Sequence, residues 1–387
     1  MPIEPDFIQQ TLADLVSTVS INPAFGAGNT SEAAVADKVA AILAAQGAQV
    51  RTLEFAPGRR SVIGRLPGTG GGRSLMLYGH LDTVSADGMT RPFAPEVREG
   101  RMYGRGCYDM KGGLTACLAA TRALARRGPL AGDLYVVAVA DEETESRGIQ
   151  QVLESLRTDG AIVTEATELD LGVAHKGFCW IEVTTEGRAA HGSRPEEGAD
   201  ANMMMGRVLA GLEPIGVAIR AGRRHPRLGA GSMHVGVLQG GTGPSIYAAS
   251  CRIEIERRLL PGESGASALA EVEQLLARLA AADPVFRARA RLLLERPSFE
   301  EDEGSPLARI VHAAATGVRG SPPAIVGHSY WMDASLLKEA GVATVVIGPS
   351  GAGAHADVEY VELDSVEQLA AILARSAEEW CGIGTRS

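Results

Sequence analysis

Apolar runs alternate with helically spaced stretches along the first part of the chain. Four runs have the length of buried strands, and they lie at 61–66, 74–81, 133–140 and 161–166. Apolar residues recur at helical spacing over 5–19, 31–47 and about 112–127. This alternation of strands and helices predicts an α/β sandwich with a largely parallel sheet.

The middle of the chain instead has the alternating pattern of half-buried strands. Strands are expected at 178–187, 231–241, 248–259 and 286–294, with helices at about 200–219 and 264–282. The resulting β-α-β-β-α-β order is typical of a small ferredoxin-like domain. The α/β pattern then resumes, with helices at 305–317, 333–341 and 365–380 and a strand at 343–348. We therefore predict one domain formed by 1–177 and 295–387, with a second domain, 178–294, inserted into it.

Composition and charge narrow the classes of protein that fit. A chain of 387 residues with 45% hydrophobic and 22% charged residues has room for two domains. The net charge of -10 argues against nucleic acid or an anionic membrane as the main partner, although a local basic pocket for an anionic substrate stays open. The five cysteines are scattered without a CxxC pair, which indicates reduced thiols. Without a signal-peptide pattern or an apolar run of about 20 residues, we expect a cytoplasmic protein.

Acidic residues and a histidine stand where predicted strands end. His80 and Asp82 close the 74–81 strand, Asp109 follows a turn-rich segment, and Glu142 and Glu143 close the 133–140 strand. Since binding sites in parallel sheets lie beyond the carboxyl ends of the strands, these side chains are expected to converge. Buried acids without partners are costly unless a cation compensates them.

Each of these segments also has a purely structural interpretation. His80 alone is equally well a strand-end histidine capped by a nearby acid, and Glu142 and Glu143 alone read as part of a solvated acidic turn. Glu165 ends the next strand, and His355 follows the 343–348 strand. Taken together, two histidines and three carboxylates without cysteine fit zinc, cobalt or manganese.

Four segments, in the right order, resemble a known family of metallopeptidases and deacylases. They are YGHLDTV (78–84), GRGCYDMKGG (104–113), ADEE (140–143) and AHADVEYV (354–361). The family includes acetylornithine deacetylase, succinyl-diaminopimelate desuccinylase, aminoacylase and a glutamate carboxypeptidase, and the resemblance extends over nearly the whole chain. It implies a zinc-peptidase-like α/β/α catalytic domain with an inserted ferredoxin-like dimerisation domain.

The resemblance also implies a two-zinc site, with cobalt or manganese as alternative metals. His80 and Glu165 would be terminal ligands of one ion, Asp109 would bridge both ions, and Glu143 with His355 would complete the second ligand set. Family members have a cis peptide after the bridging aspartate, which is Asp109-Met110 in this chain.

Further roles follow from the same resemblance. Glu142 would be the general base, and Asp82 the acid that orients His80. His191 would reach into the active site of the partner subunit of a homodimer and stabilise the oxyanion, and Arg258 would bind a substrate carboxylate.

Two departures from the family pattern affect residues that are expected to lie near the substrate. Where the family commonly has N-x-x-P in the inserted domain, this chain has Ser245 and Ala248, and Ser245 cannot reproduce both hydrogen bonds of an asparagine. The bulky pair Tyr330 and Trp331 precedes a matching aspartate, and these rings either line a pocket or pack.

The resemblance implies an enzyme that cleaves the amide bond of an N-acyl amino acid, a small carboxylate-bearing substrate. A carboxypeptidase or dipeptidase would share all these parts, and some relatives cleave ureido or carbamoyl bonds. From other classes, a catalytically inactive binding protein on this scaffold and a thiol hydrolase using Cys107 with His80 are the alternatives.

Overall fold

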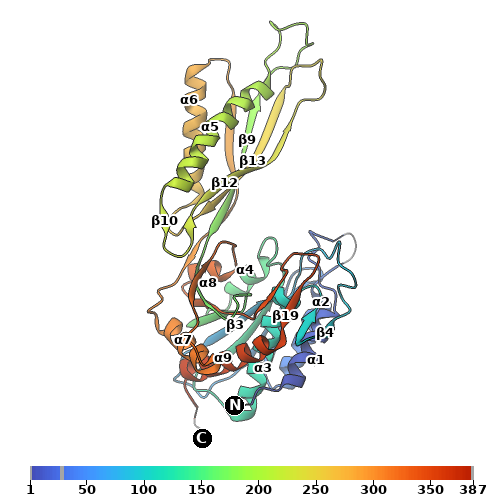
Figure 1. The fold of residues 1–387 in the computed structure, drawn as a ribbon, viewed down its shortest axis with the longest axis vertical. Coiled ribbons are helices and arrows are strands. Elements are labelled where there is room, and N and C mark those ends of the chain that lie inside the picture. Colours follow the sequence, from blue (N-terminus) through green and yellow to red (C-terminus); the bar gives the residue numbers. More distant parts are fainter. Residues whose placement is uncertain (1, 27–29, 385–387) are drawn as a thin grey trace. The chain divides into compact units, whose positions relative to one another are not determined.

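The computed structural model describes residues 2–26 and 30–384, and the chain divides into two compact units (Figure 1). Unit 1 comprises the chain up to Val173, Glu301–Val326 and the chain from Met332, and unit 2 comprises Ala174–Glu300 and Gly327–Trp331. The predicted insertion, 178–294, falls inside unit 2. Unit 2 is longer than the predicted insertion because Phe299 and Glu300 pair with His175 and Ala174, which adds residues at both ends.

Unit 1 is built on a sheet with the strand order β1-β2-β6-β3-β7-β17-β8. The strands are β1 (Gln49–Ala56), β2 (Arg59–Leu66), β3 (Leu75–His80), β6 (Leu134–Val139), β7 (Gly160–Val163), β17 (Ala343–Val346) and β8 (Leu171–His175). The four strands β6, β3, β7 and β17 are parallel, whereas β1 and β2 form an antiparallel hairpin. Every residue of β3 is buried, because layers of helices cover both faces of the sheet.

The helices of unit 1 are α1 (Pro5–Val16), α2 (Ala33–Ala45), α3 (Gly112–Arg127), α4 (Arg147–Leu153), α7 (Pro306–Arg319), α8 (Ala334–Glu339) and α9 (Leu363–Cys381). Helices α3 and α9 pack against each other and on β3, while α4 contacts α8. Gly113, in the first turn of α3, allows close contact with the end of β7, since an added Cβ would lie 2.1 Å from the main-chain oxygen of Thr164. This contact brings the segment before α3 next to the carboxyl end of β7.

A second, four-stranded sheet of unit 1 has the order β18-β19-β5-β4. Its strands are β4 (Glu96–Arg98), β5 (Arg101–Tyr103), β18 (Gly351–Ala352) and β19 (Tyr360–Glu362). Because β5 pairs with β19, the segment around residue 105 lies beside the segment around residue 355, although the two are far apart in the sequence.

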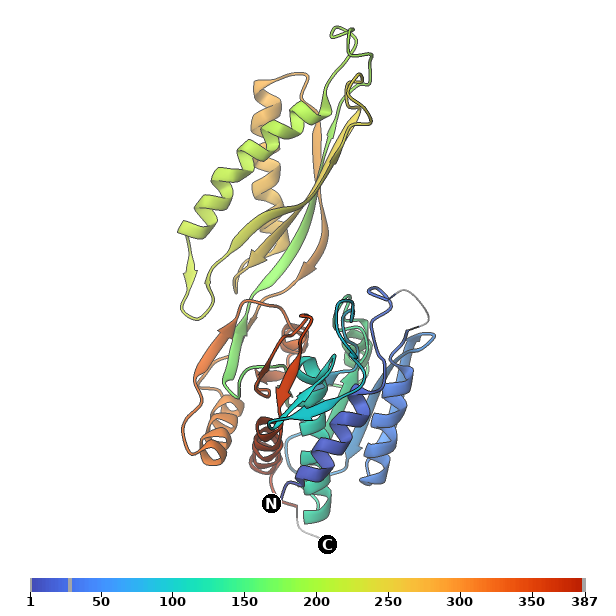
Figure 2. The same cartoon turned by 45° about the vertical axis from the view of Figure 1, so that its right-hand side comes forward.

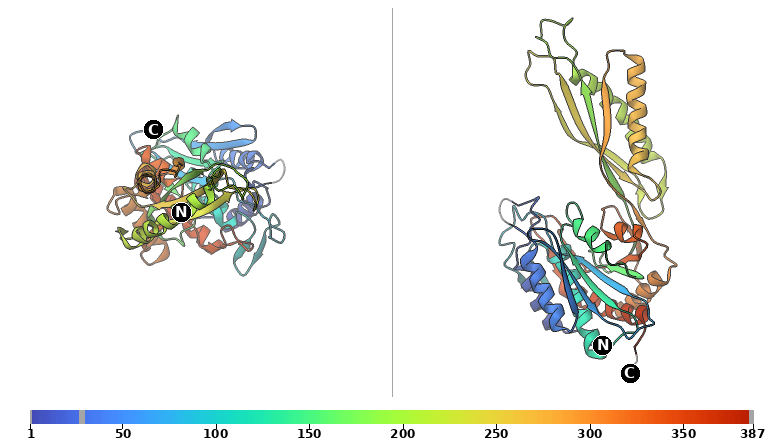
Figure 3. Two further views of the ribbon diagram at one scale, coloured as in Figure 1. Left: turned by 90° about the horizontal axis from the view of Figure 1, so that it is seen from above. Right: turned by 180° about the vertical axis from the view of Figure 1, so that it is seen from behind.

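Unit 2 has the predicted β-α-β-β-α-β order. Its antiparallel sheet, β12-β13-β9-β14, consists of β9 (Gly177–Glu186), β12 (Ser232–Gly240), β13 (Ser250–Leu259) and β14 (Ala288–Arg296). Helices α5 (Ala201–Ala221) and α6 (Gly265–Ala282) lie side by side on one face of this sheet (Figure 2). Seen from behind, the strands lie in front of α5 (Figure 3, right). The α/β fold with a ferredoxin-like insertion is therefore confirmed.

Further short strands are β10 (Arg224–His225), β11 (Gly229–Ala230), β15 (Phe299–Glu300) and β16 (Ile325–His328), and both β15 and β16 pair with β8 of the main sheet. A short helical turn, Cys107–Lys111, precedes α3. All five cysteines are free and buried. Within the described ranges, none of the helices is long and apolar enough to cross a membrane.

Candidate dinuclear metal centre

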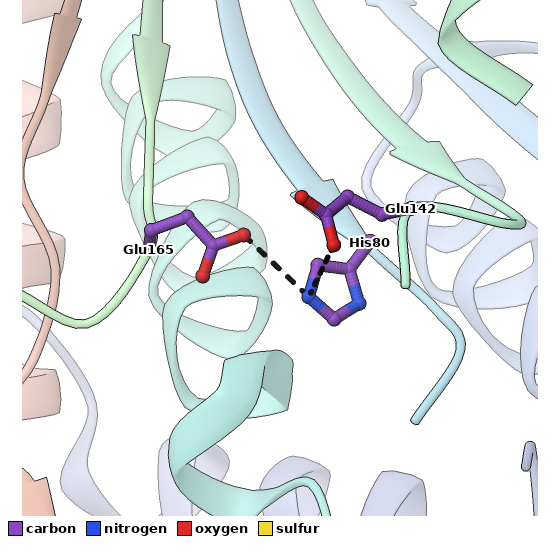
Figure 4. Close-up of side chains that lie close together, drawn as sticks. All are labelled: His80, Glu142 and Glu165. Atoms are coloured by element: carbon purple, nitrogen blue, oxygen red, sulfur yellow. Dashed lines mark ion pairs between the residues drawn. The ribbon is translucent and has the colours of Figure 1, made fainter. Parts of the chain in front are cut away.

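Three of the predicted ligand segments meet at the carboxyl ends of β3, β6 and β7. His80 is the last residue of β3, Glu142 follows β6, and Glu165 follows β7. The His80 Nε2 atom lies 3.5 Å from Glu165 Oε1 and 3.9 Å from Glu142 Oε2 (Figure 4). The three side chains come from neighbouring strands because these strands are parallel and end at one edge of the sheet.

Asp109 lies between the two histidines. Its Oδ1 atom is 3.2 Å from His80 Nε2, and its Oδ2 atom is 3.2 Å from His355 Nε2. On the far side, His355 Nε2 lies 3.1 Å from Glu143 Oε2. Two groups of three, each with ligand atoms within 4.8 Å of one another, have the spacing to hold a metal ion: His80, Glu142 and Glu165, and His80, Asp109 and Glu143. The peptide between Asp109 and Met110 is cis.

The carboxylates of this site are removed from water. The side chains of Glu142, Glu143 and Glu165 are only 10%, 7% and 7% exposed. Burial raises the pKa of Glu165 to about 8 and holds the pKa of Glu142 well above its usual range, with neighbouring carboxylates adding to both shifts. Burial also acts to raise the pKa of Asp109, but hydrogen bonds to His355 and His80 outweigh it and lower that pKa.

The donor set fits a pair of cations. Four carboxylates surround two imidazoles, so when the carboxylates ionise as metal ligands, the buried site has an excess of negative charge that cations can compensate. Among the described residues, the buried Oε1 atom of Glu143 has no hydrogen-bond partner. Nitrogen and oxygen ligands without sulfur suit zinc, cobalt or manganese. The alternative of a solvated acidic turn is wrong, because Asp141 and Glu142 are largely buried.

A hydrogen bond from the Nδ1 atom fixes the orientation of the His80 ring. The Nδ1 atom donates to the main-chain oxygen of Asp82 at 2.9 Å, which leaves Nε2 free to act as a ligand. The tautomer is assigned from this contact. The Asp82 carboxylate lies farther from the ring, at 3.7 Å. It instead accepts hydrogen bonds from the main-chain N–H groups of Glu142 and Glu143, both at 3.1 Å, and from the Asn22 amide at 2.8 Å. Asp82 thus contacts His80 through its carbonyl and holds the two glutamates through its carboxylate.

Other residues that support the acidic turn were not predicted from the sequence. Asp141 has a positive φ of 74° and pairs with Arg59 at 2.7 Å, and Arg59 also pairs with the fully buried Glu32 at 2.8 Å. Arg59 has no motif around it, so only its tertiary contacts identify it. Asn22 lies in a turn that the sequence does mark, since proline follows it.

The predicted residues of unit 2 form two groups. His191 is exposed, its Nδ1 atom is 2.8 Å from Ser193 Oγ, and the neighbouring Gly192 N–H donates to the main-chain oxygen of Ser245 at 2.8 Å. Arg258 lies near the end of β13, whereas Ser245 precedes the start of that strand. The structure therefore brings His191 and Ser245 together and places Arg258 at the other end of β13.

The Arg258 side chain already has partners within unit 2. Its Nε atom donates to Glu256 Oε1 at 2.8 Å, and its guanidinium lies over the Phe178 ring at 5.1 Å. Trp331 packs edge-on against Phe178 and donates to the main-chain oxygen of Pro297 at 3.0 Å. Of the two interpretations of Trp331, packing is the one observed.

Cys107 does not have the surroundings of a nucleophile. Its thiol is fully buried and donates to the main-chain oxygen of Met102. Burial raises the pKa of Cys107 well above its usual value, whereas catalytic thiols need a lowered pKa and access to the substrate. The alternative of a thiol hydrolase is therefore wrong.

Comparison with known proteins agrees with this geometry. The sequence pattern of the peptidase family M20/M25/M40 matches residues 76–379. Acetylornithine deacetylase from Myxococcus xanthus is 31% identical over 326 residues, covering 81% of this chain and 82% of that protein. N-formyl-4-amino-5-aminomethyl-2-methylpyrimidine deformylase from Halalkalibacterium halodurans is 30% identical over 372 residues, covering 87% and 86%. Aminopeptidase PepT from Bacillus cereus shares the fold with a TM-score of 0.81 at 19% identity, covering 97% and 99%. The chain therefore belongs to peptidase family M20/M25/M40.

Proposed function

We propose that this metallohydrolase uses two zinc ions to cleave the amide bond of N-acyl amino acids, as a deacylase similar to acetylornithine deacetylase. The observation that carries the proposal is the position of Asp109, whose two carboxylate oxygens each lie 3.2 Å from a different histidine. A carboxylate in this position can bridge two ions. The deacetylase and deformylase among the relatives support a small acyl group as the part of the substrate that water attacks, with the amine as the leaving group.

The chain has the residues to hold both ions. His80, Asp109 and Glu165 would hold one, and Asp109, Glu143 and His355 the other. When bound, two zinc ions supply Lewis-acid polarisation of the scissile carbonyl and a water of lowered pKa. Cobalt and manganese remain alternatives, and the metal content of the purified protein would decide between the three.

Glu142 is the residue proposed to move the proton. It adjoins Glu143 in the chain, yet its carboxylate faces His80 and Glu165. It would accept a proton from the attacking water and pass it to the leaving amine. Its burial suits this task, because a shielded carboxylate binds a proton more readily than a solvated one.

A homodimer is part of the proposal. His191 and Ser245 lie at one end of β13 and Arg258 at the other, so one copy of unit 2 cannot place all three around a small substrate. Two copies could, with His191 from one subunit stabilising the oxyanion and Arg258 from the other binding the carboxylate.

Mixing inactive variants tests the homodimer. His191→Ala and Glu142→Gln proteins are each expected to be nearly inactive. Exchanging their subunits should restore about a quarter of wild-type activity. Half of the dimers are then mixed, and each mixed dimer has one complete site and one site that lacks both residues. A chain that is monomeric by light scattering and fully active would contradict this part of the proposal.

A turnover screen tests the choice of substrate. N-acetyl, N-succinyl and N-formyl amino acids should be cleaved with zinc, cobalt or manganese added, while dipeptides and ureido or carbamoyl compounds should be poor substrates. Turnover of dipeptides alone would replace the deacylase with a dipeptidase or carboxypeptidase of the same family. The cytoplasmic location stays a prediction from the sequence.

A further inference from the structure

One buried ion pair joins the two loops that supply Asp109 and His355. Arg105 Nη1 lies 2.7 Å from Glu359 Oε2, and the two side chains are 3% and 0% exposed. The other guanidinium nitrogen, Nη2, donates to the main-chain oxygen of Ala356 at 3.0 Å, one residue after His355. The sequence alone indicates no role for Arg105 or Glu359.

The Glu359 carboxylate is saturated by donors from the loop that carries Asp109. Its Oε2 atom accepts the Gly106 N–H at 2.9 Å in addition to the Arg105 guanidinium. Its Oε1 atom accepts the N–H groups of Tyr108 at 2.9 Å and of Asp109 itself at 3.1 Å. Four donors on one buried carboxylate fix the main chain around Asp109 strongly, because hydrogen bonds to a charged acceptor are about twice as strong as neutral ones.

The main chain around this pair is fixed as well. The Gly104 N–H donates to the main-chain oxygen of Glu359 at 3.2 Å, which continues the pairing of β5 with β19. Gly106 has a φ of 79°, and an added Cβ would lie 2.5 Å from Thr83 Cγ2. The loop therefore has little freedom to relax if the carboxylate is altered.

We propose that Glu359 is a positioning residue for the metal ion on the His355 side. This inference rests on the proposed two-ion function. The Glu359 carboxylate accepts a hydrogen bond from the main-chain N–H of Asp109. It is connected to the main chain next to His355 through Arg105, which donates to both Glu359 and Ala356. Within the described ranges, the side-chain hydrogen bonds of Glu359 all come from the loop that carries Asp109, and Arg105 links that loop to the main chain beside His355. The strands β3 and β7, in contrast, place His80 and Glu165. Altering Glu359 should therefore weaken the His355-side ion more than the other.

The test is a calorimetric titration of the metal-free protein with Zn²⁺ or Co²⁺. Glu359→Gln keeps the shape of the side chain, but its NH₂ group faces donors and cannot accept from them. We expect two tight sites in the wild type. In the variant, one site should stay tight and the other should bind about 10- to 100-fold more weakly. Glu362→Gln is the matched control, because Glu362 lies three residues away on the same segment, is 44% exposed, and should keep both sites unchanged.

Double variants identify which ion is affected. If Glu359 acts on the His355-side ion, Glu359→Gln should cost little further affinity in a His355→Ala protein, which already lacks that site. Circular dichroism of the metal-free variants checks that they fold. If Glu359→Gln does not fold, Arg105→Lys provides the same test, since it keeps the charge but loses the bond to Ala356.

The outcomes separate this inference from the proposed function. A folded Glu359→Gln protein that binds both ions as the wild type does, or loses both equally, would overturn the inference. A wild-type protein that binds two ions yet hydrolyses no amide would overturn the proposed function and leave the inference standing.

Discussion

Glu142→Gln is expected to lower kcat by about two to four orders of magnitude while both metal ions stay bound. Glutamine fills the same volume but cannot accept a proton. The side chain is only 10% exposed, and its carboxylate faces His80 and Glu165, so bulk water is poorly placed to replace it. The measurement is kcat on an N-acetyl amino acid, alongside the metal content of the same preparation.

Glu145→Gln is the control for this experiment. Glu145 belongs to the same acidic segment, but it is exposed and should tolerate the change without loss of turnover. A Glu142→Gln protein that binds two ions and keeps near-wild-type turnover would mean that another group accepts the proton.

Removing the metal is expected to abolish turnover and to destabilise the protein, with both effects reversed by added zinc. Each ion present at 100 times its Kd stabilises the folded state by about 2.7 kcal/mol. Without the ions, the carboxylates of Glu142, Glu143 and Glu165 face one another in a buried site. Turnover and thermal unfolding before and after dialysis against a chelator provide the measurement. Full activity in protein shown to be metal-free would contradict a metal-dependent reaction.

The metal-free protein should also lose stability as pH rises. The pKa of Glu165 is about 8 in the folded state and 4.5 in its ordinary state, so between these values the folded protein holds a proton that the unfolded chain has released. Stability therefore falls as pH rises through this window. Unfolding followed from about pH 5 to pH 8 should give a declining midpoint in metal-free wild type and a shallower decline in Glu165→Gln. With metal bound the trend should weaken or reverse, because ligands that lose protons bind metal more tightly.

The strands that carry the site could be predicted because their sequences are unusually apolar. The segments ending at His80 and before Asp141 are buried on both faces, and such strands end abruptly in polar residues. The alternating strands of unit 2 could be predicted equally well, and their observed bounds differ from the predicted ones by at most two residues.

Features set by tertiary contacts could not be predicted. Strand β1 was missed because its partly exposed QVRTLEFA sequence has no continuous apolar run, and only its pairing with β2 makes it a strand. Asp82 was expected to orient His80 with its carboxylate, but that carboxylate lies nearer the N–H groups after β6. Glu359 lies in the same segment as His355, 354–361, yet nothing in the sequence links it to Asp109.

The split of unit 1 into separate chain segments bears on the order of folding during synthesis. Strand β17 pairs with β7 in the middle of the main sheet, but it is made only after the whole of β9 to β14 has left the ribosome. Unit 2 is nearly continuous in sequence, so it can fold while unit 1 still lacks this strand and His355. The metal centre is consequently among the last parts of the molecule that can form, and a nascent chain ending before β17 leaves one edge of β7 unpaired.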